Sequence, residues 1–135
     1  MVGKIDEITY NLIKKSIDAS SSRGKVIANN IANVNTKGFK ASYVVFEDKL
    51  KNILENKGID LKTTNERHIS SGNSINNINY EIKKNTASSM RLDGNNVDID
   101  SEMVSLAENT ILYNALISQT NSRIAMRRLV TNGGK

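Results

Sequence analysis

The chain has 135 residues and a formal net charge of +5, with no Cys, no Pro, no Trp and only six aromatic side chains. This length leaves little room for a second domain, and the lack of Cys excludes a disulfide framework, a thiolate nucleophile and a Cys-based metal site. The positive charge suggests an anionic partner without specifying one, and a hydrophobic fraction of 38% with few aromatics disfavours a thick globular core.

Residues 5–35 predict a long helix. Their apolar or small residues recur every three or four positions, in a heptad-like stripe that shifts by one residue near Leu12. Ser20 and Gly24 weaken the helix propensity, but they are small enough to let another helix come close. The stripe comprises Ile5, Ile8, Leu12, Ile13, Ile17, Ser20, Gly24, Ile27, Ile31 and Val34.

Neither a transmembrane helix nor a signal peptide is expected. No run of 18 apolar residues occurs in the sequence. Asp6 and Glu7 interrupt the N-terminal segment, which has no apolar core of signal-peptide length. We therefore expect synthesis in the cytosol without a cleaved secretory signal.

The segment ANNIANVNTKGFK, residues 28–40, closes the first helix. Four asparagines lie within residues 29–35, although the Asn side chain favours competing non-helical conformations. One interpretation is an uncharged polar face that hydrogen-bonds to another helix in a water-poor interface. The other is a frayed helix end with a polar surface. Asn33, Asn35 and Gly38 are expected to form the exit, because Asn and Gly tolerate the left-handed conformation that ends helices.

The middle of the chain, residues 37–97, is polar and rich in Asn, Ser, Lys and Thr. An apolar pattern predicts a short helix near residues 44–56, and two alternating segments predict short strands. Residues 65–77 predict a loop, and Asp93-Gly94 predicts a turn. These predictions rest on Phe46, Leu50, Ile53 and Leu54 for the helix, and on Ile59, Leu61, Ile78, Tyr80 and Ile82 for the strands.

Residues 100–131 predict a second long helix of roughly 48 Å, at about 1.5 Å per residue. Asp98 or Asp100 can cap its N-terminus, and three arginines near its end complete the charge order that a helix dipole favours. The apolar triplets 111–113 and 115–117 spread over more than one face, which a single partner helix cannot cover. We expect other molecules to cover the remainder.

Two long helices that bracket the chain predict a mainly α fold. The terminal helices are expected to pair as a coiled coil, with a short helix and a small β-hairpin or loop region in the middle. We expect one structural unit with three segments: an N-terminal helix at residues 1–36, a middle region at residues 37–97 and a C-terminal helix at residues 98–135.

Catalytic and metal-binding patterns are weak. His68 is the only histidine, and nothing marks a nucleophile elbow or a Gly-rich phosphate loop. A calcium loop starting at Asp93 fails, because Gly is absent from its sixth position and Glu from its twelfth. We therefore expect no enzyme activity, no cofactor and no metal. Two alternatives stay open: a basic coiled-coil module that binds nucleic acid, and a hydrolase built around His68.

The segment at residues 28–40 also resembles the N-terminal signature of flagellar rod, hook and hook-associated proteins, A-N-N-I-A-N-x-N-T-x-G-[YF]-[KR]. Lys37 stands where that family usually has Pro, which frees φ and restores an N–H in this turn. The short length and the segments TTNERHI, LDGNNVDID and MVSLAENTILYNAL are similar to a subunit of the proximal rod. They fit the other short axial subunit, FlgC, less well, and that subtype stays open as an alternative.

The resemblance implies a structural subunit of the proximal rod of the bacterial flagellar basal body, the drive shaft that joins the MS ring and export gate to the distal rod. It implies export by the flagellar type III apparatus and self-assembly through the terminal helices. The implied partners are other copies of the chain, FlgC-like rod proteins, a FliE-like adaptor, the MS ring and the export gate, with no nucleic acid and no direct membrane insertion. The implied location is the envelope or periplasmic side of the basal body.

Two sets of residues are expected to carry assembly. The resemblance assigns an axial assembly motif to Ala28, Asn29, Asn30, Ile31, Ala32, Asn33, Asn35, Thr36, Gly38 and Phe39. The apolar pattern of the last helix assigns packing to Met103, Leu106, Ala107, Ile111, Leu112, Tyr113, Leu116, Ile117 and Ile124.

Overall fold

The computed structural model describes residues 2–56, 78–87 and 91–133. The predicted strand at Ile59 and Leu61, the predicted loop at residues 65–77 and His68 lie outside the described residues. Within them the elements follow the order α1 (Val2–Ala32), β1 (Ser42–Val45), α2 (Glu47–Asn56), β2 (Glu81–Lys84) and α3 (Ile99–Thr131).

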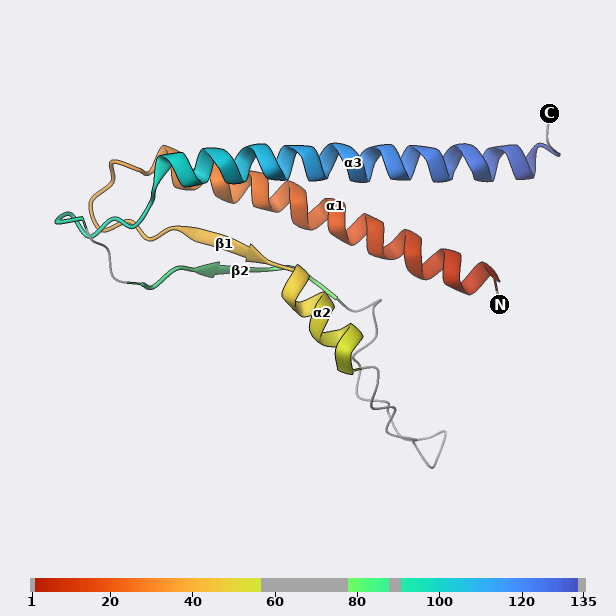
Figure 1. Cartoon of the computed structure of the whole chain (residues 1–135), viewed down its shortest axis with the longest axis horizontal. Helices are drawn as coiled ribbons and strands as arrows, with labels where there is room; N and C mark the ends of the chain where they lie inside the picture. Colours follow the sequence, from red (N-terminus) through yellow and green to blue (C-terminus); the bar gives the residue numbers. More distant parts are fainter. Residues whose placement is uncertain (1, 57–77, 88–90, 134–135) are drawn as a thin grey trace, which may run out of the picture.

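The fold-class prediction is confirmed. The long terminal helices α1 and α3 pack against each other, and a short helix and a two-stranded antiparallel sheet lie between them in the sequence. Figure 1 shows that α1 and α3 run in opposite directions, lie close together where the chain turns back, and diverge toward the two termini. None of the helices in the described part of the chain offers a stretch long and apolar enough to cross a bilayer.

Polar side chains contribute to the contact between α1 and α3. Ser20 Oγ donates a hydrogen bond to Asn109 Oδ1 at 2.9 Å, and Asn109 Nδ2 donates to the Ser20 carbonyl at 3.0 Å. A Cβ added to Gly24 would lie 3.5 Å from Asn109 Nδ2, so the helices come close at this level. This confirms that the small residues of the α1 stripe admit another helix. Farther along, the Arg127 guanidinium lies 5.2 Å from the centre of the Tyr10 ring, a cation–π distance.

The hydrophobic core lies on the other side of α1, against β1 and α2. Its centre consists of Ala19, Phe46 and Ile78, each at most 3% exposed, with partly buried side chains of α1 and α2 packed around them. Phe46 directly precedes α2, and the first turn of α2 carries Glu47 and Asp48, which the positive end of the helix dipole stabilises. The short helix expected near residues 44–56 therefore begins three residues later, at Glu47, directly after the buried Phe46.

The sheet differs in part from the prediction. β2 occupies Glu81–Lys84 rather than residues 78–82, and its partner β1 was not predicted as a strand. The antiparallel register pairs Ser42 with Lys84 and Val45 with Glu81. In β1, Val44 is buried while the neighbouring Tyr43 is exposed, which is the alternation of a half-buried strand. The prediction of helix at residues 44 and 45 was therefore wrong, because both belong to β1.

Candidate functional site

Asn30 joins three elements at the point where α1 meets α3. Its side chain is 1% exposed. The Nδ2 atom donates to the Ser42 carbonyl at 2.8 Å and to Glu102 Oε1 at 3.0 Å, and Oδ1 accepts from the Ser42 N–H at 3.0 Å. The amide thus bonds both backbone groups of Ser42 at the edge of β1, as a neighbouring strand would. Of the two interpretations of the asparagine face, hydrogen bonding to another helix describes Asn30, and that helix belongs to the same chain.

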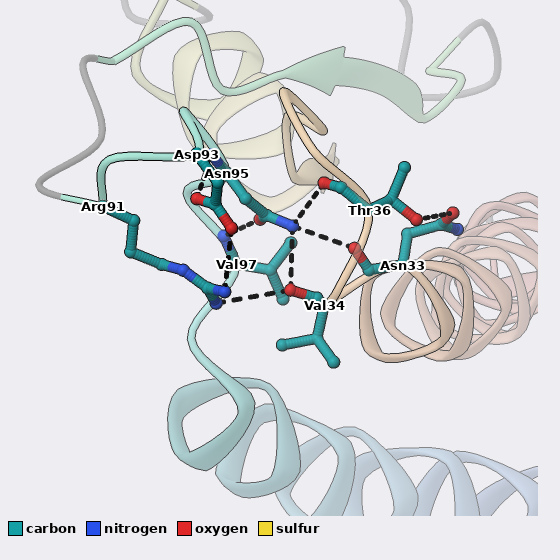
Figure 2. Close-up of polar contacts among 7 residues, drawn as sticks. All are labelled: Asn33, Val34, Thr36, Arg91, Asp93, Asn95 and Val97. Atoms are coloured by element: carbon teal, nitrogen blue, oxygen red, sulfur yellow. Dashed lines mark hydrogen bonds and ion pairs between the residues drawn. The ribbon is translucent and has the colours of Figure 1, made fainter.

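Asn95 is distant from α1 in the sequence, but its side chain caps the carboxyl end of that helix. The side chain is fully buried. Its Nδ2 atom donates to the carbonyls of Asn33, Val34 and Thr36, each at 2.9 Å, and its Oδ1 accepts from the Val97 N–H at 2.8 Å (Figure 2). Carbonyls at a helix C-terminus lack partners within the helix, and here one side chain supplies a donor to three carbonyls of the exit turn.

The helix exit does not use left-handed asparagines, as the sequence suggested for Asn33 and Asn35. Among the described residues, positive φ occurs only at glycines, and Gly38 has a φ of 72°. Asn33 instead donates from Nδ2 to the Asn29 carbonyl at 2.8 Å and accepts from Thr36 Oγ1 at 3.2 Å. Because Asn33 and the buried amide of Asn95 satisfy carbonyls in this region, only Gly38 has to adopt the left-handed conformation.

Two turns meet beside this buried amide. The Gly38 N–H donates to the Asp93 carbonyl at 2.8 Å, and a Cβ added to Gly94 would lie 3.7 Å from the Gly38 Cα. Asp93 Oδ1 accepts from the Asn95 N–H at 3.1 Å, and Asp93 Oδ2 pairs with the Arg91 guanidinium at 2.9 Å. The turn predicted at Asp93-Gly94 is confirmed, with φ of 75° at Gly94. We call Asn30, Asn33, Asp93, Asn95 and Glu102 the asparagine junction.

Glu102 is the acidic side chain that α3 contributes to the asparagine junction. It lies in the first turn of α3. Burial raises the pKa of Glu102 above its usual value, and the hydrogen bond from Asn30 offsets only part of that effect. A carboxylate that is partly buried between helices is therefore held in place by an uncharged amide.

The predicted assembly motif divides between buried and exposed positions. Asn30 is buried, Ile31, Asn33 and Phe39 are half-buried, and Ala28, Asn29, Ala32, Asn35, Thr36 and Gly38 are exposed. The buried Asn30 bonds only within the chain. The exposed members, together with the accessible part of the half-buried ones, are available to another molecule.

The predicted packing residues of α3 are mostly uncovered. Leu106, Leu116 and Ile117 are half-buried, whereas Met103, Ala107, Ile111, Leu112, Tyr113 and Ile124 are exposed. Ile111 is 71% exposed and Met103 is 52% exposed. In the described part of α3, Asn109 is the buried residue. Contact with α1 therefore leaves most of the apolar surface of α3 without a partner.

Sequence patterns do not reveal three residues that matter here: Asn95, Glu102 and Asn109. Their partners lie 61, 72 and 89 positions away in the sequence, so no local period marks them. The one local signal is the paired asparagine after the Asp93-Gly94 turn, and it does not reveal which of the two is buried. No group of three or more potential metal ligands occurs among the residues that the structure describes.

Comparison with known proteins gives consistent matches. Residues 18–40 match a family model described as "Flagella basal body rod protein". The chain is 34% identical over 127 residues to "Flagellar basal body rod protein FlgB" of Bacillus subtilis (strain 168), covering 94% of this chain and 95% of the relative. The proteins of the same name from Borrelia hermsii and Proteus mirabilis (strain HI4320) are 35% and 30% identical, covering 81% and 99% of this chain and 84% and 100% of the relatives.

Proposed function

The chain belongs to the FlgB family of flagellar basal body rod proteins and is a structural subunit of that rod, and from this premise we propose that it forms the proximal part of the shaft by self-assembly through its terminal helices. The family is not known to be enzymatic. The relatives carry the name FlgB, which favours that subtype over FlgC.

The observation that carries the proposal is the exposed apolar surface of α3. Side chains on several faces of the helix are uncovered, from Met103 at 52% exposure to Val130 at 80%. Monomeric soluble proteins rarely expose large contiguous apolar patches, and a helix that is apolar on several faces is stable only when buried on several sides. Since α1 covers one side of α3, other subunits are the source of the remaining cover.

The asparagine junction has a supporting role in this proposal. It fixes the end of α1 to the start of α3 through Asn30 and Asn95, so the two helices leave the junction as one hairpin. The exposed members of the motif, including Ala28, Ala32 and Asn35, stay accessible on the surface of the hairpin. The motif thus orients the helices with its buried side and meets neighbouring subunits with its exposed side.

The proposed route and partners follow from this assignment. We propose export by the flagellar type III apparatus and assembly at the envelope or periplasmic side of the basal body. The proposed neighbours are further copies of the chain, FlgC-like rod proteins, a FliE-like adaptor, the MS ring and the export gate. The division into residues 1–36, 37–97 and 98–135 is proposed as the division between assembling helices and a middle region that fits individual neighbours.

A single exposed substitution tests the proposal. Ile111→Asp places a charge on the apolar surface of α3, where the side chain is 71% exposed in the single chain. Its far-UV circular dichroism and secreted level should match the unchanged protein, whereas a strain carrying only this variant should not swim and should lack complete basal bodies. Asn52→Asp is the matched control, because it adds the same charge at an exposed position of α2. Normal swimming with Ile111→Asp would overturn the proposal.

A further inference from the structure

The charges of α3 are separated along its length. From residue 98 to residue 122 every charged side chain is acidic, and from residue 123 to residue 135 every charged side chain is basic. The helix dipole accounts for charges in the first and last turns. It does not account for Glu108, which lies ten residues into the helix and is exposed.

Glu108 borders a cleft of about 330 Å³ where α1, α2 and α3 meet. Arg23 Nη2 bonds both carboxylate oxygens of Glu47 at 2.7 and 2.6 Å. Burial acts to raise the pKa of Glu47, but the bonds and charge of Arg23 and two backbone N–H groups outweigh it and lower that pKa. Glu47 and Arg23 therefore neutralise each other, and Glu108 gives the cleft its negative charge. The cleft is lined by Arg23, Glu47, Ser105, Glu108, Asn109 and Leu112.

The basic end of α3 has the complementary chemistry. Arg127 and Arg128 are both exposed, and Arg127 lies over the Tyr10 ring of the same chain. Leu129 and Met126 are 57% and 59% exposed. One end of α3 thus presents a guanidinium flanked by apolar side chains, and the cleft presents a carboxylate beside the exposed Leu112.

We propose that the basic end of α3 of one copy docks in the Glu108 cleft of the next copy, with Arg128 paired to Glu108. The inference rests on the proposed function, because it names the surfaces through which the chain self-assembles. Glu108 and Arg128 are 20 residues apart on one helix, about 30 Å at 1.5 Å per residue, so they cannot pair within a chain. The cleft and the basic end are different surfaces, and between copies whose α3 helices are parallel a contact of this kind repeats from copy to copy, as a ring or an open helix.

This contact sets a register. If the α3 helices of successive copies are parallel, residue n of the docked end lies beside residue n − 20 of the cleft. The copies are then offset by about 30 Å along α3. Ala125 of one copy would lie beside Ser105 of the next, and the exposed Leu129 would cover the polar Ser20–Asn109 contact from outside.

The first experiment is a charge exchange in a strain that carries only the variant protein. Glu108→Arg alone and Arg128→Glu alone should each reduce swimming at least tenfold while leaving the secreted protein level unchanged. The double variant Glu108→Arg/Arg128→Glu should restore swimming, and the restored pair must come from two molecules. Asp18→Arg combined with Arg128→Glu is the control, because Asp18 is an exposed acidic residue of α1 that does not line the cleft. Swimming restored equally by the control, or not restored by the exchange, would overturn the pairing.

A second experiment tests the register by disulfide formation and does not require a charge-reversed variant to be secreted. The chain has no Cys, so Ser105→Cys/Ala125→Cys introduces the only thiols, about 30 Å apart within one helix and too far for an internal disulfide. Mild oxidation of isolated basal bodies should give a ladder of covalent oligomers. Basal bodies that contain the chain but give no ladder would refute the register and leave the proposed function intact. Basal bodies that lack the chain would refute the proposed function itself.

Discussion

Replacing Asn95 by Asp inverts the hydrogen bonding at the centre of the asparagine junction with almost no change in shape. In the native chain Nδ2 points at the carbonyl oxygens of Asn33, Val34 and Thr36, each at 2.9 Å. Asn95→Asp puts a carboxylate oxygen in that position, where four oxygens would then face one another. The acceptor bond from the Val97 N–H at 2.8 Å is retained, so the effect isolates the lost donor and the added charge.

The size of the effect follows from the surroundings of the three carbonyls. Each keeps a second donor: the Thr36 N–H for Asn33, the Arg91 guanidinium for Val34, and the Phe39 N–H for Thr36. Lost hydrogen bonds therefore account for the smaller part of the cost. The larger part is an uncompensated buried carboxylate, about 3–5 kcal/mol of unfolding free energy at neutral pH, against about 5–15 kcal/mol for a typical domain.

Urea unfolding followed by circular dichroism measures this loss. The midpoint of Asn95→Asp should fall well below that of the unchanged chain at pH 7 and recover partly at low pH, because protonation removes the charge and restores one donor. Asn35→Asp is the control, since it makes the same change at an exposed position of the same turn and should cost no more than about 0.5 kcal/mol. If the two variants unfolded at the same urea concentration, the buried amide would not be what secures the end of α1.

Three further predictions concern titration, surface charge and exchange. The folded pKa of Glu102 lies above its unfolded value, so the stability that Glu102 contributes is present below pH 4.5 and is lost as the pH rises through the folded pKa. The unfolding free energy of Glu102→Gln relative to the unchanged chain should therefore rise between pH 4 and pH 7. A pH-independent difference would contradict this. Arg23→Met should lower the unfolding free energy by no more than about 1 kcal/mol, because the Glu47 carboxylate of the pair is largely exposed. In 1 M NaCl this difference should disappear. A larger loss that persists in salt would show that the Arg23–Glu47 ion pair is needed to hold the fold. In the isolated chain, amide hydrogen exchange at residues 111–130 should be fast, because this part of α3 has few buried side chains. The same amides should exchange slowly in basal bodies. Strong protection in the isolated chain would show that other copies are not needed to stabilise this part of α3.

The long elements were predictable because their signal is local and repeated. The stripe of α1 and the capped, dipole-matched pattern of α3 each extend over some 30 residues, so tertiary contacts shift only their ends. Ser20 and Gly24 were predictable as a close-approach site, because small residues at stripe positions weaken a helix on its own and yet leave space for a second helix. The turn at Asp93-Gly94 was likewise local.

The short strand and the buried amides were not predictable, because each depends on a partner far away in the sequence. The four residues of β1 acquire strand geometry from pairing with β2 about 40 residues later and from the Asn30 amide at their other edge. Asn95 has the same chemistry as Asn96, and only the fold decides that one is fully buried. Glu102 has the sequence pattern of an ordinary first-turn acid, since its burial requires α1 to lie against it.

A residue-resolution map of basal bodies purified from the source bacterium would show whether the exposed surface of α3 is covered by neighbouring subunits. We expect the chain to occupy the rod with α1 and α3 still paired through Asn30–Glu102 and Ser20–Asn109, and with Ile111, Met126 and Val130 buried against neighbouring subunits. A map in which the chain is present but these three side chains face solvent, or in which α1 and α3 have separated, would contradict it.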